Sequence, residues 1–172
     1  TRMMTAVLLS PTSYNIQHWR FIRITDTNTR LKIKDAAWGQ QQVEDASEVI
    51  ILCADTQAWS DHPERYWSNA DQHTQAVLLP MLDAFYTDKP QTQRDEAMRS
   101  CGMAAQTLML SAKALGYDTC PMEGFDSKRV KQIMNLPKSA EITMIVSCGV
   151  RDEKGVYGSQ FRIPFEEIYF AS

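Results

Sequence analysis

Four short stretches of the chain have the apolar patterns of β-strands. Two of them, SEVIILCAD (47–55) and AEITMIVSCGV (140–150), are continuous apolar runs, which are typical of strands buried on both faces. WRFIRITD (19–26) alternates between apolar and polar residues, and DTCPM (118–122) is extended in character. The pattern therefore predicts strands, at least two of which have no solvent-exposed face.

Helical spacing separates these strands. The predicted helices are residues 2–9 (the end of a helix), 27–38, about 71–87, 94–115 and about 127–135. Thr27 to Thr29 offer helix-start chemistry, and Pro80 predicts a kink. The helix at 94–115 ends at Gly116 and has small or apolar residues on almost every face, so we expect it to be buried all round.

Two segments lack a regular pattern. Residues 56–70 are polar and aromatic and contain Pro63, so we expect an exposed segment. Its aromatic residues Trp59, Tyr66 and Trp67 are compatible with surface packing or with a substrate lid. Residues 151–172 are expected to form a loop and an extended tail. With no repeat and no linker in the chain, one α+β domain over residues 1–172 is the economical interpretation.

Composition narrows the functional classes. The chain has 172 residues, of which 44% are hydrophobic, and this suits one globular domain with a substantial core. A formal net charge of −3 gives no basic footprint for nucleic acid. No apolar run approaches the ~20 residues of a membrane span, and no secretory signal begins the chain, which starts with Thr1.

Cysteine and histidine usage indicates neither disulfides nor a metal. Each of the four cysteines lies in an apolar or helical stretch and none forms a C-x-x-C pair, which is typical of reduced core thiols in a cytoplasmic protein. The three histidines lack metal-ligand spacing. We therefore expect a cytoplasmic protein without a metal site.

The common catalytic motifs are absent. There is no G-x-S-x-G elbow, no phosphate loop and no G-x-G-x-x-G fingerprint. Three stretches remain, namely SPTSYNIQHWRF (10–21), CPMEGFD (120–126) and GSQFRIPFEE (158–167). The first contains seven hydrogen-bonding side chains within nine positions, more than chain reversal requires. It is either an ordinary wet loop or a binding loop for a polar ligand.

Taken in order, these stretches resemble the FMN-dependent nitroreductase family. The resemblance covers nearly the whole chain and also includes WGQQQVEDAS (38–47) and the long helix that ends in ALGY. It implies a three-layer α/β/α sandwich with a mixed central sheet flanked by helices. It also implies a homodimer whose flavin sites lie between the two subunits.

The resemblance implies a set of FMN-binding residues. Pro121 and Met122 would form a wall against one face of the flavin ring, and the backbone N–H groups of Glu123 and Gly124 would point at flavin N5. Gly124 would allow the backbone to approach the ring closely. The other implied contacts are Pro11, Thr12, Ser13 and Asn15 from the second subunit, Gln40 and Gln42, Gln160, and Arg162, which would bind the FMN phosphate. Gln17 and Trp19 are expected to secure the opening loop instead of touching the cofactor.

Two departures from the family pattern bear on FMN binding. Family members carry an Arg-rich first helix that grips the phosphate, and we expect this sequence to begin downstream of it, so that the N-terminal phosphate-binding helix is missing. At the position of Gln42 many relatives have a lysine. Glutamine can donate a hydrogen bond there but brings no positive charge.

The implied activity is a ping-pong oxidoreductase. NADH or NADPH would reduce FMN, and a nitro compound, a quinone or a similar small-molecule acceptor would then be reduced. No side-chain acid or base is evident, so no catalytic residue is assigned. The alternative is a relative, with or without flavin, that acts as a binding or interaction module without reductase turnover.

Overall fold

The computed structural model describes residues 2–152 and 160–171. Its centre is a four-stranded sheet with the order β1-β2-β4-β3. The strands are β1 (Trp19–Arg23), β2 (Glu48–Asp55), β3 (Asp118–Met122) and β4 (Ala140–Gly149). All three pairings between these strands are antiparallel, in a register that places Ile51 opposite Ile22 on one side and opposite Ile145 on the other.

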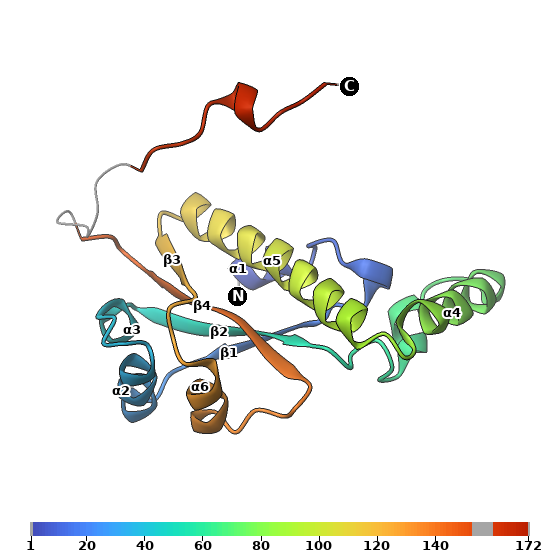
Figure 1. Cartoon of the computed structure of the whole chain (residues 1–172), viewed down its shortest axis with the longest axis horizontal. Coiled ribbons are helices and arrows are strands. Elements are labelled where there is room, and N and C mark those ends of the chain that lie inside the picture. The colour runs from blue at the N-terminus through green and yellow to red at the C-terminus, as the bar shows by residue number, and fades with distance from the viewer. Residues whose placement is uncertain (1, 153–159, 172) are drawn as a thin grey trace.

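The expected mixed sheet is therefore corrected to an antiparallel one among the described strands. Continuous apolar runs are most typical of parallel sheets, which have helices on both faces. Here an antiparallel sheet is also covered on both faces, and this coverage, not the strand direction, accounts for the apolar runs. The three-layer arrangement itself is confirmed (Figure 1).

Alternate side chains of β2 supply the cores of two different layers. Val49, Ile51 and Cys53 pack with α2, α3 and α6, whereas Ile50, Leu52 and Ala54 pack with α1 and α5 (Figure 1). The helices are α1 (Arg2–Val7), α2 (Thr27–Ala36), α3 (Gln42–Asp45), α4 (Gln72–Tyr86), α5 (Pro90–Ala114) and α6 (Ser127–Ile133). β2 is thus buried on both faces, as the sequence predicts.

Aspartate side chains fix the starts of three helices. Asp26, Asp71 and Asp126 each accept a hydrogen bond from the backbone N–H three residues later. The start of α2 is therefore capped by Asp26 instead of by Thr27 to Thr29. α5 begins at Pro90, earlier than expected, because proline suits the first turn of a helix.

One face of α5 is not buried by the rest of the chain. Ala97, Ala104 and Ala105 are fully buried against the sheet, but Met103 is 38% exposed and Leu110 is 61% exposed. The expected all-round burial is therefore wrong for the single chain. The small residues let the helix lie close to the sheet, and its other apolar face has no cover among the described residues.

The segment between β2 and α4 is more ordered than its polar sequence suggests. It contains a short 3₁₀ helix, Pro63–Trp67, and Ala58 is fully buried. The Trp59 ring stacks on that of Tyr86 at a centroid distance of 5.7 Å. The expectation of an exposed segment is thus wrong at these positions, since aromatic packing ties the segment to α4, beyond the end of the sheet (Figure 1).

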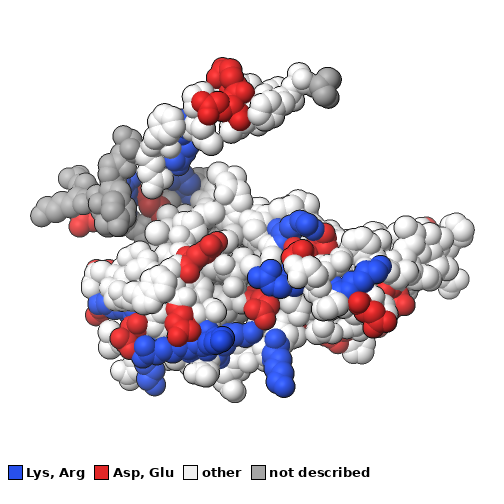
Figure 2. Space-filling model, viewed as in Figure 1, with Lys and Arg blue, Asp and Glu red and all other residues white. Residues whose placement is uncertain are grey.

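Acidic and basic side chains both lie over the region of α2 and α6 on the face shown in Figure 2. No helix among the described residues is long and apolar enough to cross a membrane.

Cys53, Cys101 and Cys148 are buried thiols, whereas Cys120 is exposed because β3 is an edge strand.

The C-terminal tail lies apart from these layers. Every described residue from 160 to 171 is exposed, and the tail contains one 3₁₀ turn, Phe165–Glu167. In Figure 1 it extends away from the sheet and its covering helices. The expected loop and extended tail are confirmed for the described residues, while residues 153–159 and 172 lie outside them.

We expect Ala104→Leu to destabilise the protein because the larger side chain has no room between α5 and the sheet. Overpacking of this kind costs about 1–3 kcal/mol of unfolding free energy. The control is Ala114→Leu, the same change at an exposed position of the same helix, for which we expect a change within about 0.5 kcal/mol. Urea denaturation of both variants measures the difference. Equal stability of the two variants would contradict the close packing of α5.

Candidate cofactor site

The connection from β3 to α6 holds Glu123 and Gly124 between two fixed ends. Met122, the last residue of β3, is buried, and the N–H of Asp126 donates to the carbonyl of Ala36 at 2.9 Å. Between them, the N–H of Phe125 donates to the carbonyl of Glu123 at 3.0 Å. Within the described part of the chain, the N–H groups of Glu123 and Gly124 have no acceptor. They are two fixed donors available to a ligand.

Two glutamine side chains orient this turn. Nε2 of Gln42 donates to Oε1 of Gln40 at 3.0 Å, and Nε2 of Gln40 donates to the carbonyl of Gly124 at 2.6 Å. The chain of amides fixes the peptide plane that follows Gly124. The structure thus brings three predicted site residues together, and it gives Gln40 a supporting role toward the Gly124 backbone.

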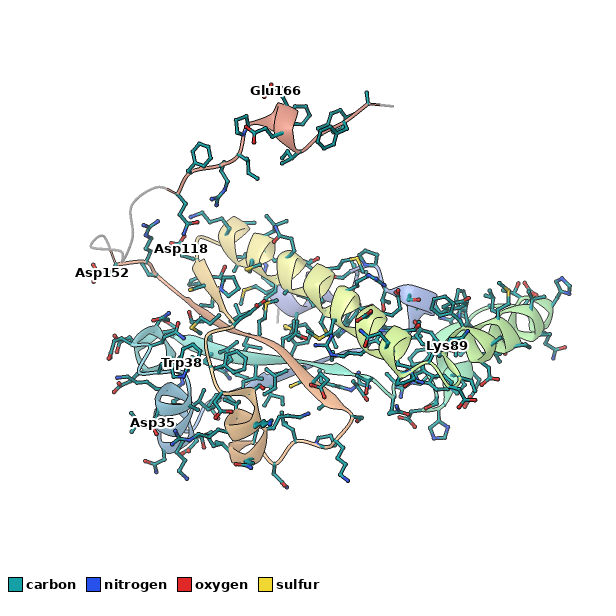
Figure 3. The ribbon with its side chains drawn as sticks, viewed as in Figure 1. Asp35, Trp38, Lys89, Asp118, Asp152 and Glu166 are labelled. Carbon is teal, nitrogen blue, oxygen red and sulfur yellow. The ribbon has the colours of Figure 1, made fainter. Side chains whose placement is uncertain are left out.

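Trp38 lies against Gly124, although the sequence did not predict it as a site residue. A Cβ added to Gly124 would lie 3.1 Å from Cζ3 of Trp38 and 3.3 Å from Nε2 of Gln40, so glycine is needed for this close approach. The Trp38 side chain is 74% exposed, and its φ of +56° is unusual for a bulky residue. Figure 3 shows it between α3 and the segment that joins β3 to α6. The sequence feature that could have indicated Trp38 is its position just after the end of α2, next to Gly39.

The expected flavin wall is only partly available. The ring of Pro121 is exposed, but Met122 is 4% exposed and its side chain packs in the core with α2 and α6. Met122 can therefore present backbone but no side-chain surface. The alternation of β3 explains this, because neighbouring residues of a strand point to opposite faces.

The opening loop turns its hydroxyl groups toward its own chain. Oγ of Ser10 donates to Oγ1 of Thr107 at 2.9 Å, and Oγ1 of Thr12 lies 2.9 Å from Oγ of Ser100. The hydroxyl of Tyr86 donates to Oγ of Ser13 at 2.9 Å. The sequence suggested Thr12 and Ser13 as ligand contacts, but in this chain both hydroxyls bond to α4 or α5.

Pro11 and Asn15 are the exposed members of the loop. Nδ2 of Asn15 donates to the carbonyl of Tyr66 at 2.8 Å, and Nε2 of Gln17 donates to the carbonyl of Asn15 at 3.1 Å. Gln17 therefore braces the loop, as the sequence suggested. Trp19 is buried under α5, where it anchors the start of β1.

The opening loop and the Gly124 turn lie at opposite edges of the sheet. The loop precedes β1 and the turn follows β3, and these are the two edge strands. β2 and β4 lie between them, which places the edges about 14 Å apart at a strand spacing of about 4.8 Å. Within one chain the two groups of predicted residues do not form a common site.

Gln160 and Arg162 belong to the exposed tail. Nη1 of Arg162 donates to the carbonyl of Phe161 at 3.2 Å and to Oε1 of Gln160 at 3.4 Å. Among the described residues, the guanidinium is paired with no carboxylate, so its charge is available to an anion. The tail that carries both residues extends away from the sheet and its covering helices (Figure 1).

The chemistry of the Gly124 turn suits a flat, polar-edged cofactor. Two backbone donors, an exposed proline ring and neutral side-chain amides are collected there, next to a glycine whose missing side chain lets Trp38 and Gln40 pack against the turn. No group of three potential metal ligands occurs among the described residues. These features fit the edge and face of a flavin ring, to which the turn offers backbone hydrogen-bond donors.

Comparison with known sequences identifies the family. The nitroreductase family profile matches residues 1–150 of this chain. Protein DrgA of Synechocystis sp. is 46% identical over 171 residues, which are 97% of this chain and 81% of DrgA. The NADH dehydrogenase of Thermus thermophilus is 31% identical over 179 residues, covering 96% of this chain and 81% of that protein.

Solved structures give the same result. The crystal structure of ydfN from Bacillus subtilis matches with a TM-score of 0.93 at 30% identity, covering 99% of this chain and 86% of that one. A crystal structure from Exiguobacterium sibiricum, determined in complex with FMN, matches with a TM-score of 0.88 at 26% identity and covers 99% of this chain and 84% of its own. The fold expected from the sequence is thus confirmed. The chain belongs to the nitroreductase family, a family of oxidoreductases.

Proposed function

We propose that the protein is an FMN-dependent NAD(P)H oxidoreductase that works as a homodimer, with each flavin bound between two subunits. The observation that carries the proposal is the separation of the predicted contacts onto opposite edges of the sheet, where only a second chain can join them. Bound FMN would supply the redox chemistry, taking a hydride from NADH or NADPH and passing one to a nitro compound, a quinone or a similar acceptor in a separate, ping-pong step.

Relatives support the choice of cofactor and reductant. The Exiguobacterium structure contains FMN, and the Thermus relative is named NADH dehydrogenase. MhqN of Bacillus subtilis, which is 32% identical over 174 residues, has NAD(P)H nitroreductase in its name. Both nicotinamides remain candidate reductants for this chain.

The Gly124 turn would hold the reactive part of the flavin ring. The N–H groups of Glu123 and Gly124 would donate to N5 and to the neighbouring carbonyl oxygen, and Pro121 would contact the ring face. The Gln42 side-chain N–H that is not bonded to Gln40 would donate to the pyrimidine edge of the ring, on the side opposite N5. All of these groups are neutral, so they orient the ring and the acceptor through hydrogen bonds and contact without transferring a proton.

The phosphate of FMN requires positive charge. Arg162 carries a planar guanidinium suited to bidentate phosphate binding, and among the described residues it has no competing carboxylate. Gln160, two residues earlier, would contribute an amide. Both would act from the tail, together with the Pro11–Asn15 loop.

Unpaired apolar surface supports the dimer. Large apolar side chains left exposed in a single chain can mark protein interfaces. On α5, on the segment after α1 and in the tail, the exposed large apolar side chains are Leu8, Leu9, Met103, Leu110, Phe161, Ile163, Phe165, Ile168, Tyr169 and Phe170. We propose that a second copy of the chain covers them.

Flavin spectroscopy tests the proposed function. The purified protein, mixed with FMN and separated from the excess, should show a bound-flavin spectrum that bleaches when NADH or NADPH is added without oxygen. Adding a quinone or a nitroaromatic compound should then restore the colour. A protein that takes up no FMN would instead be the flavin-less interaction module. One that takes up FMN but does not bleach would be a flavin binder without turnover.

Subunit mixing tests the shared site. Asn15→Ala damages the loop and Gly124→Val damages the turn, so each homodimer has two singly damaged sites. A heterodimer has one intact and one doubly damaged site. Random mixing through a reversible unfolding step should therefore restore activity to about one quarter of the wild-type value, since half of the dimers in a twofold-symmetric assembly become heterodimers. Activity no higher than that of the parents after mixing would show that the two segments act within one subunit.

We expect Gly124→Val to weaken FMN binding by about tenfold or more, equivalent to about 1.4 kcal/mol, because the added side chain would push against Trp38 and Gln40 and shift the backbone donors of the turn. Isothermal titration with FMN measures the loss. The matched control introduces Gly124→Val into a Trp38→Ala background, where the contact with Trp38 is absent. Recovery of FMN affinity in the double variant would assign the loss to displaced Trp38. Unchanged affinity in Gly124→Val would contradict the role of the turn.

A further inference from the structure

The opening loop holds an unusual concentration of backbone strain. Tyr14, Asn15 and Gln17 have φ values of +48°, +58° and +55°, in the left-handed region that residues other than glycine rarely adopt. Such conformations are costly and persist only where the surrounding structure enforces them. Something outside the loop must therefore hold it in this form.

Two side chains from the neighbouring helices provide this hold. The hydroxyl of Tyr86, at the end of α4, donates to Oγ of Ser13 at 2.9 Å. Oγ of Ser100, on α5, lies 2.9 Å from Oγ1 of Thr12. Both anchoring residues are almost fully buried, at 0% and 1% exposure. They meet the loop immediately before its strained residues.

Tyr86 is itself fixed by further contacts. Nε2 of the buried Gln93 donates to the carbonyl of Tyr86 at 2.9 Å, and the ring of Trp59 stacks on Tyr86. On the other side, Oγ1 of Thr12 also accepts a hydrogen bond from the N–H of Gln17 at 3.3 Å, which links the two ends of the strained stretch. The anchors thus transmit the rigidity of the helices to the loop.

His18 completes the surroundings of Thr12. Its side chain is fully buried, with Nδ1 3.4 Å from Oγ1 of Thr12. Burial lowers the pKa of His18 to about 4, so the imidazole is neutral at neutral pH. The groups around Thr12 therefore form an uncharged network, which holds the loop in place without presenting a charge to the ligand.

We infer that Tyr86 and Ser100 are positioning residues that hold the Thr12–Gln17 loop, strained and preformed, in the shape that meets the flavin. The inference rests on the proposed function, since it assigns these residues to the loop's cofactor contacts. A preformed loop binds more tightly than one that must be ordered when the cofactor arrives. Neither residue would need to touch FMN.

The test compares Tyr86→Phe and Ser100→Ala with two matched controls. Thr87→Val removes another hydroxyl at the end of α4, which donates to Oδ1 of Asp83 at 3.0 Å. Thr56→Val removes another hydroxyl anchor, which donates to the carbonyl of Ser139 at 3.0 Å. We expect the anchor variants to bind FMN at least tenfold more weakly than wild type, and the controls to bind within twofold of it.

Amide hydrogen exchange of the flavin-free protein supplies the second readout. Peptides covering residues 12–17 should exchange at least tenfold faster in the two anchor variants, with the rest of the chain unchanged. Faster exchange spread over the whole chain would give the anchors a purely structural role and overturn the inference, as would unchanged exchange and unchanged FMN affinity. If wild type binds no FMN, the proposed function fails, and local exchange at residues 12–17 alone decides whether Tyr86 and Ser100 hold the loop.

Discussion

β2 carries apolar side chains toward both faces of the sheet, and neither face can be left in water. Val49 and Ile51 require the α2 and α6 layer, whereas Ile50 and Leu52 require α5. Helices therefore occupy both faces, and ligand contacts are left to the edges and ends of the strands. β1 and β3 are the edges, and the loop before one and the turn after the other carry most of the predicted flavin contacts. The proposed division of the site between two subunits rests on this strand order.

The two edges prepare their contacts by different means. At the β3 edge, the amide groups of Gln42 and Gln40 fix the carbonyl of Gly124 and leave the preceding N–H groups without acceptors in the described chain. At the β1 edge, hydroxyl groups from α4 and α5 hold a loop whose backbone is strained. In both places neutral hydrogen bonds set the backbone before any ligand arrives. This is the preorganisation that binding a rigid, planar cofactor favours.

The sequence predicted the parts of the fold that depend on local pattern. The buried strand at 47–55 and the helix that begins at Ser127 are both features of a few neighbouring residues. Contacts between distant residues could not be predicted this way: Thr12 meets Ser100 across 88 positions, and Trp38 meets Gly124 across 86 positions. The prediction that α5 is buried all round was wrong for a related reason. Its apolar pattern does not indicate whether the surface that covers it belongs to the same chain.

The proposed site differs in charge from a flavin site that has a lysine at the position of Gln42. Nε2 of Gln42 is already engaged with Gln40, so at most one of its two N–H bonds is available to a ligand. Negative charge that develops on a ligand at this edge would meet N–H dipoles and no ammonium group, and a dipole stabilises an anion less than a full charge does. In the proposed site the positive charge comes from Arg162, in a tail that lies outside the sheet layers (Figure 1). The proposed flavin site would thus be divided, with orientation supplied by the folded body and charge neutralisation by the tail.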